Sequence, residues 1–171
     1  MKKISFRNDV LPLKNELYRL ALRITLNPAD AEDVVQETMI KVWNRRERWD
    51  EIESMEAFCL TICRNISLDK MRKMENLSQS LEEGQDAPDL SYASNPEEQA
   101  MQQDRIALVR KLIDRLPEKQ RSIMLLRETE GKSYKEIAAI MEISEEQVKV
   151  NLFRARQTIK QRYIETENYG L

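Results

Sequence analysis

The chain has 171 residues, of which 41% are hydrophobic, 34% are charged and only three are glycine. This length allows one ordinary domain or two small ones, and the composition favours helices over a β-sandwich or a β-barrel. No apolar run approaches the roughly 20 residues of a membrane helix, and no apolar segment follows the lysines near the N-terminus. We therefore expect a cytoplasmic protein with neither a membrane insertion nor an export signal.

The net charge of −2 conceals an uneven distribution of charge along the chain. Residues 1–75 carry a net charge of +1, residues 76–104 a net charge of −7, and residues 105–171 a net charge of +4. The acidity is therefore concentrated in the middle, and the last third is mildly basic. Such a distribution permits, without proving, a surface near the C-terminus that binds nucleic-acid phosphates.

The two cysteines, Cys59 and Cys63, are accompanied by no histidine anywhere in the chain. A disulfide does not persist in a reducing compartment, and two thiolates with carboxylates make a poor tetrahedral zinc site. We therefore expect both cysteines to pack in the core, and we expect no metal ion and no cofactor. The chain also lacks a glycine-rich phosphate loop and a nucleophile with a base, which argues against an enzyme.

Residues 1–75 form a first block of three expected helices. The apolar residues of the first helix recur at helical spacing: Leu13, Leu17, Leu20 and Ile24. Asn27 and Pro28 suit the N-cap and first turn of a second helix that runs to about Arg46. The inward residues of this second helix are Val35, Met39 and Val42.

Ser54 can cap a third helix, after a short polar stretch that contains Trp49. The apolar stripe of this helix has offsets of three and four residues: Met55, Phe58, Cys59, Ile62 and Ile66.

The periodicity disappears from about residue 76, and residues 76–95 read as an acidic linker that is polar and rich in turn residues. Its charge should keep it extended and away from DNA phosphates. A solvated loop within a single domain is the alternative.

Helical order resumes in a second block, residues 96–171. Asn95 and Pro96 repeat the pattern of cap and proline, Leu116 and Pro117 break one helix and begin the next, and Gly131 ends that next helix. Two capping boxes follow: Ser133 with Glu136, and Ser144 with Gln147. Together they predict a short helix of about eight residues, a tight turn and a long terminal helix.

This last pattern is typical of a helix-turn-helix. The inward stripes are Tyr134, Ile137, Ala138 and Met141 on the short helix, Ile143 in the turn, and Val148, Leu152, Ala155 and Ile159 on the long helix. Rotation by 100° per residue places a set of polar and small side chains on the opposite face: Gln147, Val150, Asn151 and Arg154. These groups can reach base edges and phosphates, although a helical hairpin with a solvated polar face is the alternative. Glu142 stands where the turn commonly has glycine.

Three motifs, in order and separated by the linker, resemble the extracytoplasmic-function (ECF) sigma factors of bacteria. Residues 30–38, continuing through Lys41 to Trp43, resemble the helix of that family that binds core RNA polymerase. Residues 58–72 resemble its −10 helix. Residues 116–121, 136–138 and 148–156 are similar to its −35-binding domain. The resemblance implies an all-α protein with two small domains, sigma domain 2 (1–75) and sigma domain 4 (96–171), and no catalytic role.

The resemblance also implies the function of each surface. On the second helix an acidic-polar patch would dock on the clamp helices of the polymerase β′ subunit: Asp33, Gln36, Glu37 and Lys41. From charge alone the alternative is a solvated face, and without histidine a carboxylate metal site there is weak. The family also contacts the β subunit, and a membrane-anchored anti-sigma factor commonly holds it inactive, so we expect an anti-sigma partner.

For promoter DNA the resemblance implies two further sets of residues. The −10 set would capture the opened strand: Trp49, Thr61, Arg64, Asn65, Arg72 and Lys73. Trp49 could stack on a base or simply anchor its loop. The −35 set would enter the major groove: Ser144, Gln147, Lys149, Val150, Asn151 and Arg154. The expected function is promoter-specific transcription initiation, and the alternative is a stand-alone helix-turn-helix regulator, which would bind DNA without polymerase.

Overall fold

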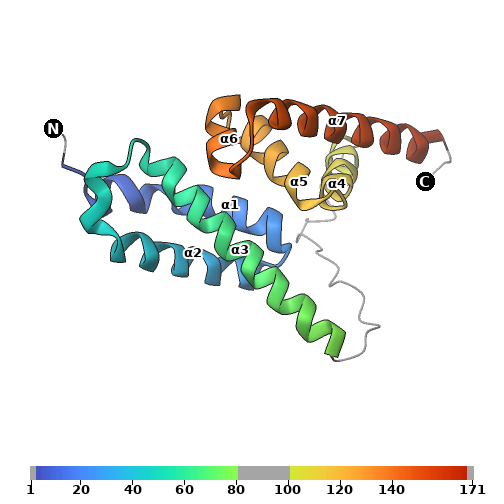
Figure 1. Ribbon diagram of the computed structural model, residues 1–171. Coiled ribbons are helices and arrows are strands. Elements are labelled where there is room, and N and C mark those ends of the chain that lie inside the picture. Colours follow the sequence, from blue (N-terminus) through green and yellow to red (C-terminus); the bar gives the residue numbers. More distant parts are fainter. Residues whose placement is uncertain (1–2, 81–100, 169–171) are drawn as a thin grey trace.

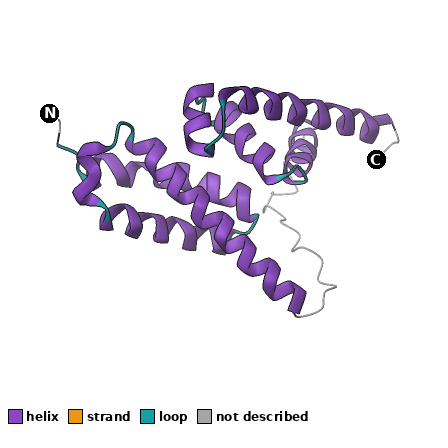
Figure 2. Cartoon of the chain, viewed as in Figure 1, coloured by secondary structure: helices purple, strands orange, loops and turns teal. Residues whose placement is uncertain are grey.

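The computed structural model describes residues 3–80 and 101–168, and within these ranges all regular structure is helical (Figures 1 and 2). The N-terminal group of helices consists of η1 (Phe6–Val10), η2 (Leu11–Leu13), α1 (Lys14–Thr25), α2 (Pro28–Asn44), η3 (Arg46–Glu51) and α3 (Met55–Ser80). The C-terminal group consists of α4 (Met101–Asp114), α5 (Glu118–Met124), η5 (Leu125–Thr129), α6 (Tyr134–Met141) and α7 (Glu145–Asn168). The all-α expectation is confirmed.

The expected caps begin the helices of the N-terminal group. The Asn27 side chain accepts a hydrogen bond from the Asp30 N–H at 3.1 Å, and the Ser54 hydroxyl accepts one from the Ala57 N–H at 3.1 Å. Each bond satisfies one of the N–H groups that a helix start leaves without a partner. α2 ends at Asn44, two residues before the expected end, because a 3-10 helix follows at Arg46.

The core of the N-terminal group lies between α1, α2 and α3, which pack side by side (Figure 1). Its fully buried side chains come mostly from the predicted stripes: Leu17, Leu20, Ile24, Val34, Val42, Cys59 and Cys63. The Thr38 hydroxyl is also buried, and it donates to the Val34 carbonyl at 2.7 Å, so this buried hydroxyl has a hydrogen-bond partner.

α3 continues to Ser80, so the first five residues of the expected linker, 76–80, are helical; the bounds of the linker stay a prediction. The helix start expected at Asn95 and Pro96 lies outside the described residues.

The C-terminal group contains the expected helix-turn-helix, formed by α6 and α7. Ser133 and Glu136 form both bonds of the capping box: the hydroxyl accepts from the Glu136 N–H at 3.1 Å, and the carboxylate accepts from the Ser133 N–H at 3.2 Å. Gly131 before it has a φ of +67°, and Glu142 in the turn has a φ of +59°, where glycine is usual. The inward residues Ile137, Val148 and Leu152 are buried.

The two groups of helices pack against each other, with α1 next to α5 and α3 next to α6 (Figure 1). Most buried apolar residues of the two groups form one continuous hydrophobic cluster. This arrangement determines which of the candidate surfaces are accessible.

Candidate functional surfaces

The exposed face of α2 carries the whole predicted polymerase-binding set, since Asp33, Gln36, Glu37 and Lys41 are all exposed. The Asp33 carboxylate also accepts a hydrogen bond from Lys70 of α3 at 3.3 Å. Two large apolar side chains outside the predicted set share this face: Ile40, which is 60% exposed, and Trp43, which is 46% exposed. A face that mixes charge with exposed apolar surface is typical of a protein-binding site.

Trp49 is buried in the 3-10 helix between α2 and α3, with 7% of its surface exposed. Its indole N–H donates to the Val42 carbonyl at 3.1 Å, while Phe6 stacks on it at 6.5 Å and Trp43 meets it edge-on at 6.1 Å between ring centroids. This geometry favours the anchoring alternative for Trp49. Its stacking on a base stays a prediction.

The predicted −10 residues of α3 differ in how far they are exposed to solvent. Asn65, Arg72 and Lys73 are exposed, and Arg72 also pairs with Asp69 of the same helix at 3.5 Å. The Thr61 hydroxyl donates to the Ala57 carbonyl of its own helix at 2.8 Å. Arg64 is buried against the C-terminal group, where it pairs with Glu118 at the start of α5.

The predicted −35 residues lie on and just before α7, around a shallow groove of about 500 Å³. The groove is lined by Lys119, Ser144, Glu146, Gln147, Val150, Asn151 and Arg154. The Asn151 amide donates to the Gln147 carbonyl at 2.7 Å, whereas Lys149 lies with its Nζ 5.5 Å from the centroid of the Tyr134 ring. Apart from the half-exposed Asn151, the side chains of this set are exposed, as a DNA-reading face requires.

Three residues of this region are absent from the predicted −35 set: Lys119 and Glu146, which line the groove, and Phe153 on α7. Lys119 reaches the groove from the first turn of α5, and no local pattern connects it to α7. Phe153 is 62% exposed on α7, and an exposed aromatic residue beside the outward positions of a recognition helix was the signal that could have identified it.

Charged contacts join the two groups of helices. Arg19 of α1 donates to both carboxylate oxygens of Glu130, at 2.6 and 2.7 Å. Arg23 of α1 pairs with Asp114 at 3.0 Å.

Lys132, after α5 and η5, lies between two carboxylates of the N-terminal group, with Glu16 at 3.2 Å and Glu56 on its other side. Burial lowers the pKa of Lys132, but its hydrogen bonds to Glu56 and Glu16 outweigh burial, so the pKa is raised on balance. The ammonium group is therefore held in its charged form at the interface.

Arg121 of α5 is the most buried of the interface cations, with 8% of its surface exposed. Its guanidinium donates to the carbonyls of Arg23 and Ile24 at the end of α1, at 2.8 and 3.2 Å. Burial lowers the pKa of Arg121. Because the last carbonyls of a helix lack partners within the helix, Arg121 satisfies the C-terminus of α1 from across the interface.

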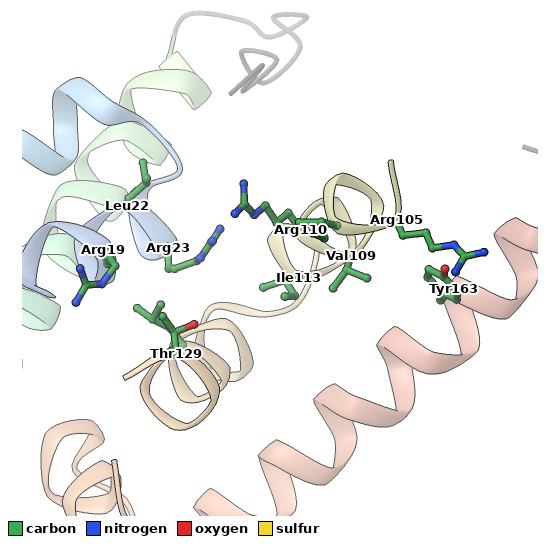
Figure 3. A pocket seen from close by; sticks show the side chains of 11 residues that line it. Arg19, Leu22, Arg23, Arg105, Val109, Arg110, Ile113, Thr129 and Tyr163 are labelled. Carbon is green, nitrogen blue, oxygen red and sulfur yellow. The ribbon is translucent and has the colours of Figure 1, made fainter. Parts of the chain in front are cut away.

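A pocket of about 550 Å³ opens between α1, α4, η5 and α7 (Figure 3). Its apolar lining includes Leu22, Ile106 and Ile113, and arginines from α1 and α4 surround them. Two of the four arginines that line the pocket, Arg19 and Arg23, form the ion pairs described above, so half of its arginines are held at the interface.

Burial raises the pKa of the thiols of both Cys59 and Cys63 to about 12, so they are protonated core residues, as expected. In the part of the chain that the structure describes, no group of three or more cysteine, aspartate and glutamate side chains could hold a metal ion. Over the same residues, no helix combines the length and the apolar character that crossing a bilayer requires.

Comparison with known proteins matches both groups of helices to one family. The family model described as Sigma-70 region 2 matches residues 10–76, and the model described as Sigma-70, region 4 matches residues 106–159. The "Probable RNA polymerase sigma factor RfaY" of Xanthomonas campestris is 29% identical over 157 residues, which are 88% of this chain; the chain spans only 38% of that relative's length. The "ECF RNA polymerase sigma factor SigL" of Mycobacterium tuberculosis is 31% identical over 84% of this chain and 80% of its own length.

The solved structures show the same fold. The sigma factor RpoE of Bartonella quintana, in its complex with the anti-sigma factor NepR, superposes with a TM-score of 0.71 over 94% of this chain and 96% of that one, at 24% identity. The chain therefore belongs to the sigma-70 family, with region 2 in the N-terminal group of helices and region 4 in the C-terminal group. Within that family it is an ECF sigma factor.

Proposed function

We propose that this chain directs core RNA polymerase to particular promoters and helps to open them. The observation that carries the proposal is the coexistence, on one chain, of three separate surfaces with matching chemistry. These are the mixed polar and apolar face of α2, the exposed polar residues of α3, and the groove along the recognition helix α7. A stand-alone helix-turn-helix regulator would need only the last of them.

The α2 face is the proposed contact with polymerase, on the clamp helices of its β′ subunit. Glu37 and Gln36 would orient the docking by charge and hydrogen bonding, and the exposed Ile40 and Trp43 would supply apolar contact area. The C-terminal group would contact the β subunit.

The DNA contacts divide between the two groups. On α7, Arg154 would read guanine, and Gln147 or Asn151 would read adenine, in the −35 major groove. On α3, Asn65 would read a base of the opened −10 strand, while Arg64 and Arg72 would hold phosphates. None of these contacts requires chemical catalysis by the chain. Because two weak sites on one scaffold raise each other's effective concentration, both are needed for stable promoter binding.

An anti-sigma factor is the proposed regulatory partner. Two structural relatives were solved as such complexes: RpoE with NepR, and CnrH with the cytosolic domain of CnrY. The need for polymerase and promoter DNA also places the proposed site of action in the cytoplasm.

The test is transcription with purified components. Core polymerase that receives the chain should produce transcripts with defined start sites, and core polymerase alone should not. Glu37→Lys should weaken polymerase binding in a pull-down, whereas Asp104→Lys, an equal charge reversal on exposed α4, should not. Equal loss in both variants, or transcripts without defined starts, would refute the proposal.

A further inference from the structure

Arg64 and Glu118 form a two-pronged ion pair across the interface between the two groups of helices. The Arg64 Nε donates to Glu118 Oε1 at 3.1 Å, and its Nη2 donates to Oε2 at 3.2 Å. Only 11% of the Arg64 side chain and 21% of the Glu118 side chain are exposed. Parallel hydrogen bonds to two oxygens are also the geometry in which a guanidinium binds a phosphate. The carboxylate therefore occupies the donors that a DNA strand would use.

The surrounding contacts hold this pair in place. The Ser122 hydroxyl, one turn along α5, donates to Glu118 Oε1 at 3.3 Å and orients the carboxylate. The ion pairs of Arg19 with Glu130 and of Arg23 with Asp114 join the same two groups of helices. Arg64 is thus covered by an interface in which charged contacts surround a shared apolar core.

The other candidate surfaces stay open in the same arrangement. The polymerase-binding face of α2, Asn65 and Arg72 on α3, and Arg154 on α7 are all exposed. Packing of the two groups consequently blocks one phosphate ligand of the −10 surface while leaving polymerase and −35 DNA free to bind.

We propose that Glu118 acts as an internal substitute for a DNA phosphate and masks Arg64 until the two groups of helices separate. This inference rests on the proposed −10 role of Arg64. The free chain binds single-stranded DNA weakly, because only the fraction of molecules with separated groups offers Arg64, and the apparent dissociation constant rises in inverse proportion to that fraction. Because the polymerase-binding face of α2 is exposed in the packed arrangement, the chain can dock on polymerase before the two groups of helices separate.

The experiment removes charge from the interface of the full chain while keeping side-chain shape. The test variant is Glu118→Gln with Glu130→Gln. The matched control is Glu128→Gln, since Glu128 pairs with Arg156 within the C-terminal group, with Arg156 Nε at 3.0 Å. A third variant adds Arg64→Ala to the test variant, to show whether Arg64 is the group that is released.

Two quantities are measured in each variant. Fluorescence energy transfer between dyes on Asn8→Cys and Gln157→Cys, both exposed positions, reports separation. Burial of the native cysteines disfavours their reaction with the dyes. Fluorescence anisotropy reports the affinity for a short single-stranded DNA pool of random sequence, which is a suitable probe because phosphate contacts do not depend on sequence.

The test variant should show lower energy transfer and bind the DNA pool roughly three- to tenfold more tightly than the wild type. The control should match the wild type, and Arg64→Ala should abolish the gain. A gain that survives Arg64→Ala, separation without a gain, or no change in either quantity would each overturn the masking role of Glu118. Transcription by the wild-type chain with core polymerase tests the proposed function independently. A failure of the masking role of Glu118 can therefore be distinguished from a failure of the proposed function.

Discussion

Replacement of Arg121 by alanine should destabilise the protein by about 3–5 kcal/mol, because several buried carbonyls lose their partner together. Arg121 donates to Arg23 and Ile24 in α1 at 2.8 and 3.2 Å, and to Leu116 and Asp114 in its own group at 2.9 and 3.3 Å. A hydrogen bond from a charged donor contributes about 1.5 kcal/mol or more, so the two short bonds alone account for about 3 kcal/mol. The two longer bonds add the remainder.

Urea unfolding followed by circular dichroism measures this loss. Arg121→Lys should retain part of the stability, since an ammonium group is a point donor that cannot span carbonyls from both groups of helices. Arg115→Ala is the control: this arginine is exposed, and its loss should change the free energy of unfolding by less than about 0.5 kcal/mol. A loss below about 1 kcal/mol for Arg121→Ala would show that Arg121 does not join the two groups as described.

Three further predictions concern the DNA surfaces and the helix-turn-helix. Arg154→Ala should weaken binding to −35 DNA by about 1–3 kcal/mol in a gel-shift assay with the polymerase complex. The control variant Arg162→Ala, two turns further along α7, should leave this binding unchanged. Equal effects of the two variants would contradict the assignment of Arg154 to the DNA-binding face of α7. Asn65→Ala should leave polymerase affinity unchanged in a pull-down but reduce permanganate-reactive open complex, and a parallel loss of affinity would argue for a structural role. Hydrogen bonds from the backbone and hydroxyl of Ser133 lower the pKa of Glu136. The wild type should therefore be more stable than Glu136→Gln above the ordinary glutamate pKa, and this difference in stability should vanish as the pH falls through the lowered pKa of Glu136. A difference in stability that does not depend on pH would refute this prediction.

Local features of the fold were predictable from the sequence. Asn27, Ser54 and Ser133 begin helices because their side chains bond to N–H groups three residues along, a relationship that spacing alone reveals. The inward stripes of α6 and α7 follow in the same way from helical periodicity, and Glu142 adopts a positive φ although it is not glycine. The outward phase of Arg154 on α7 was predictable by the same rotation.

The interface between the two groups of helices was not predictable. The sequence places Arg64 in the predicted −10 set, and it contains no sign that its partner, Glu118, lies 54 residues away. Arg19 and Glu130 are 111 residues apart, and neither belongs to a local motif. The sequence could not show whether Trp49 is buried either, because the burial of its ring depends on contacts with Phe6 and Trp43, which come from separate elements. Long-range pairs of this kind depend on packing rather than on any periodic pattern.

A footprint of a responsive promoter fragment tests the central claim most directly. The claim is that the two groups of helices bind their separate DNA segments stably only when polymerase holds the groups apart. Core polymerase together with the chain should protect both the −35 and the −10 segments, while the chain alone at the same concentration should protect neither. Strong protection by the chain alone would contradict the account and indicate an independent DNA-binding regulator.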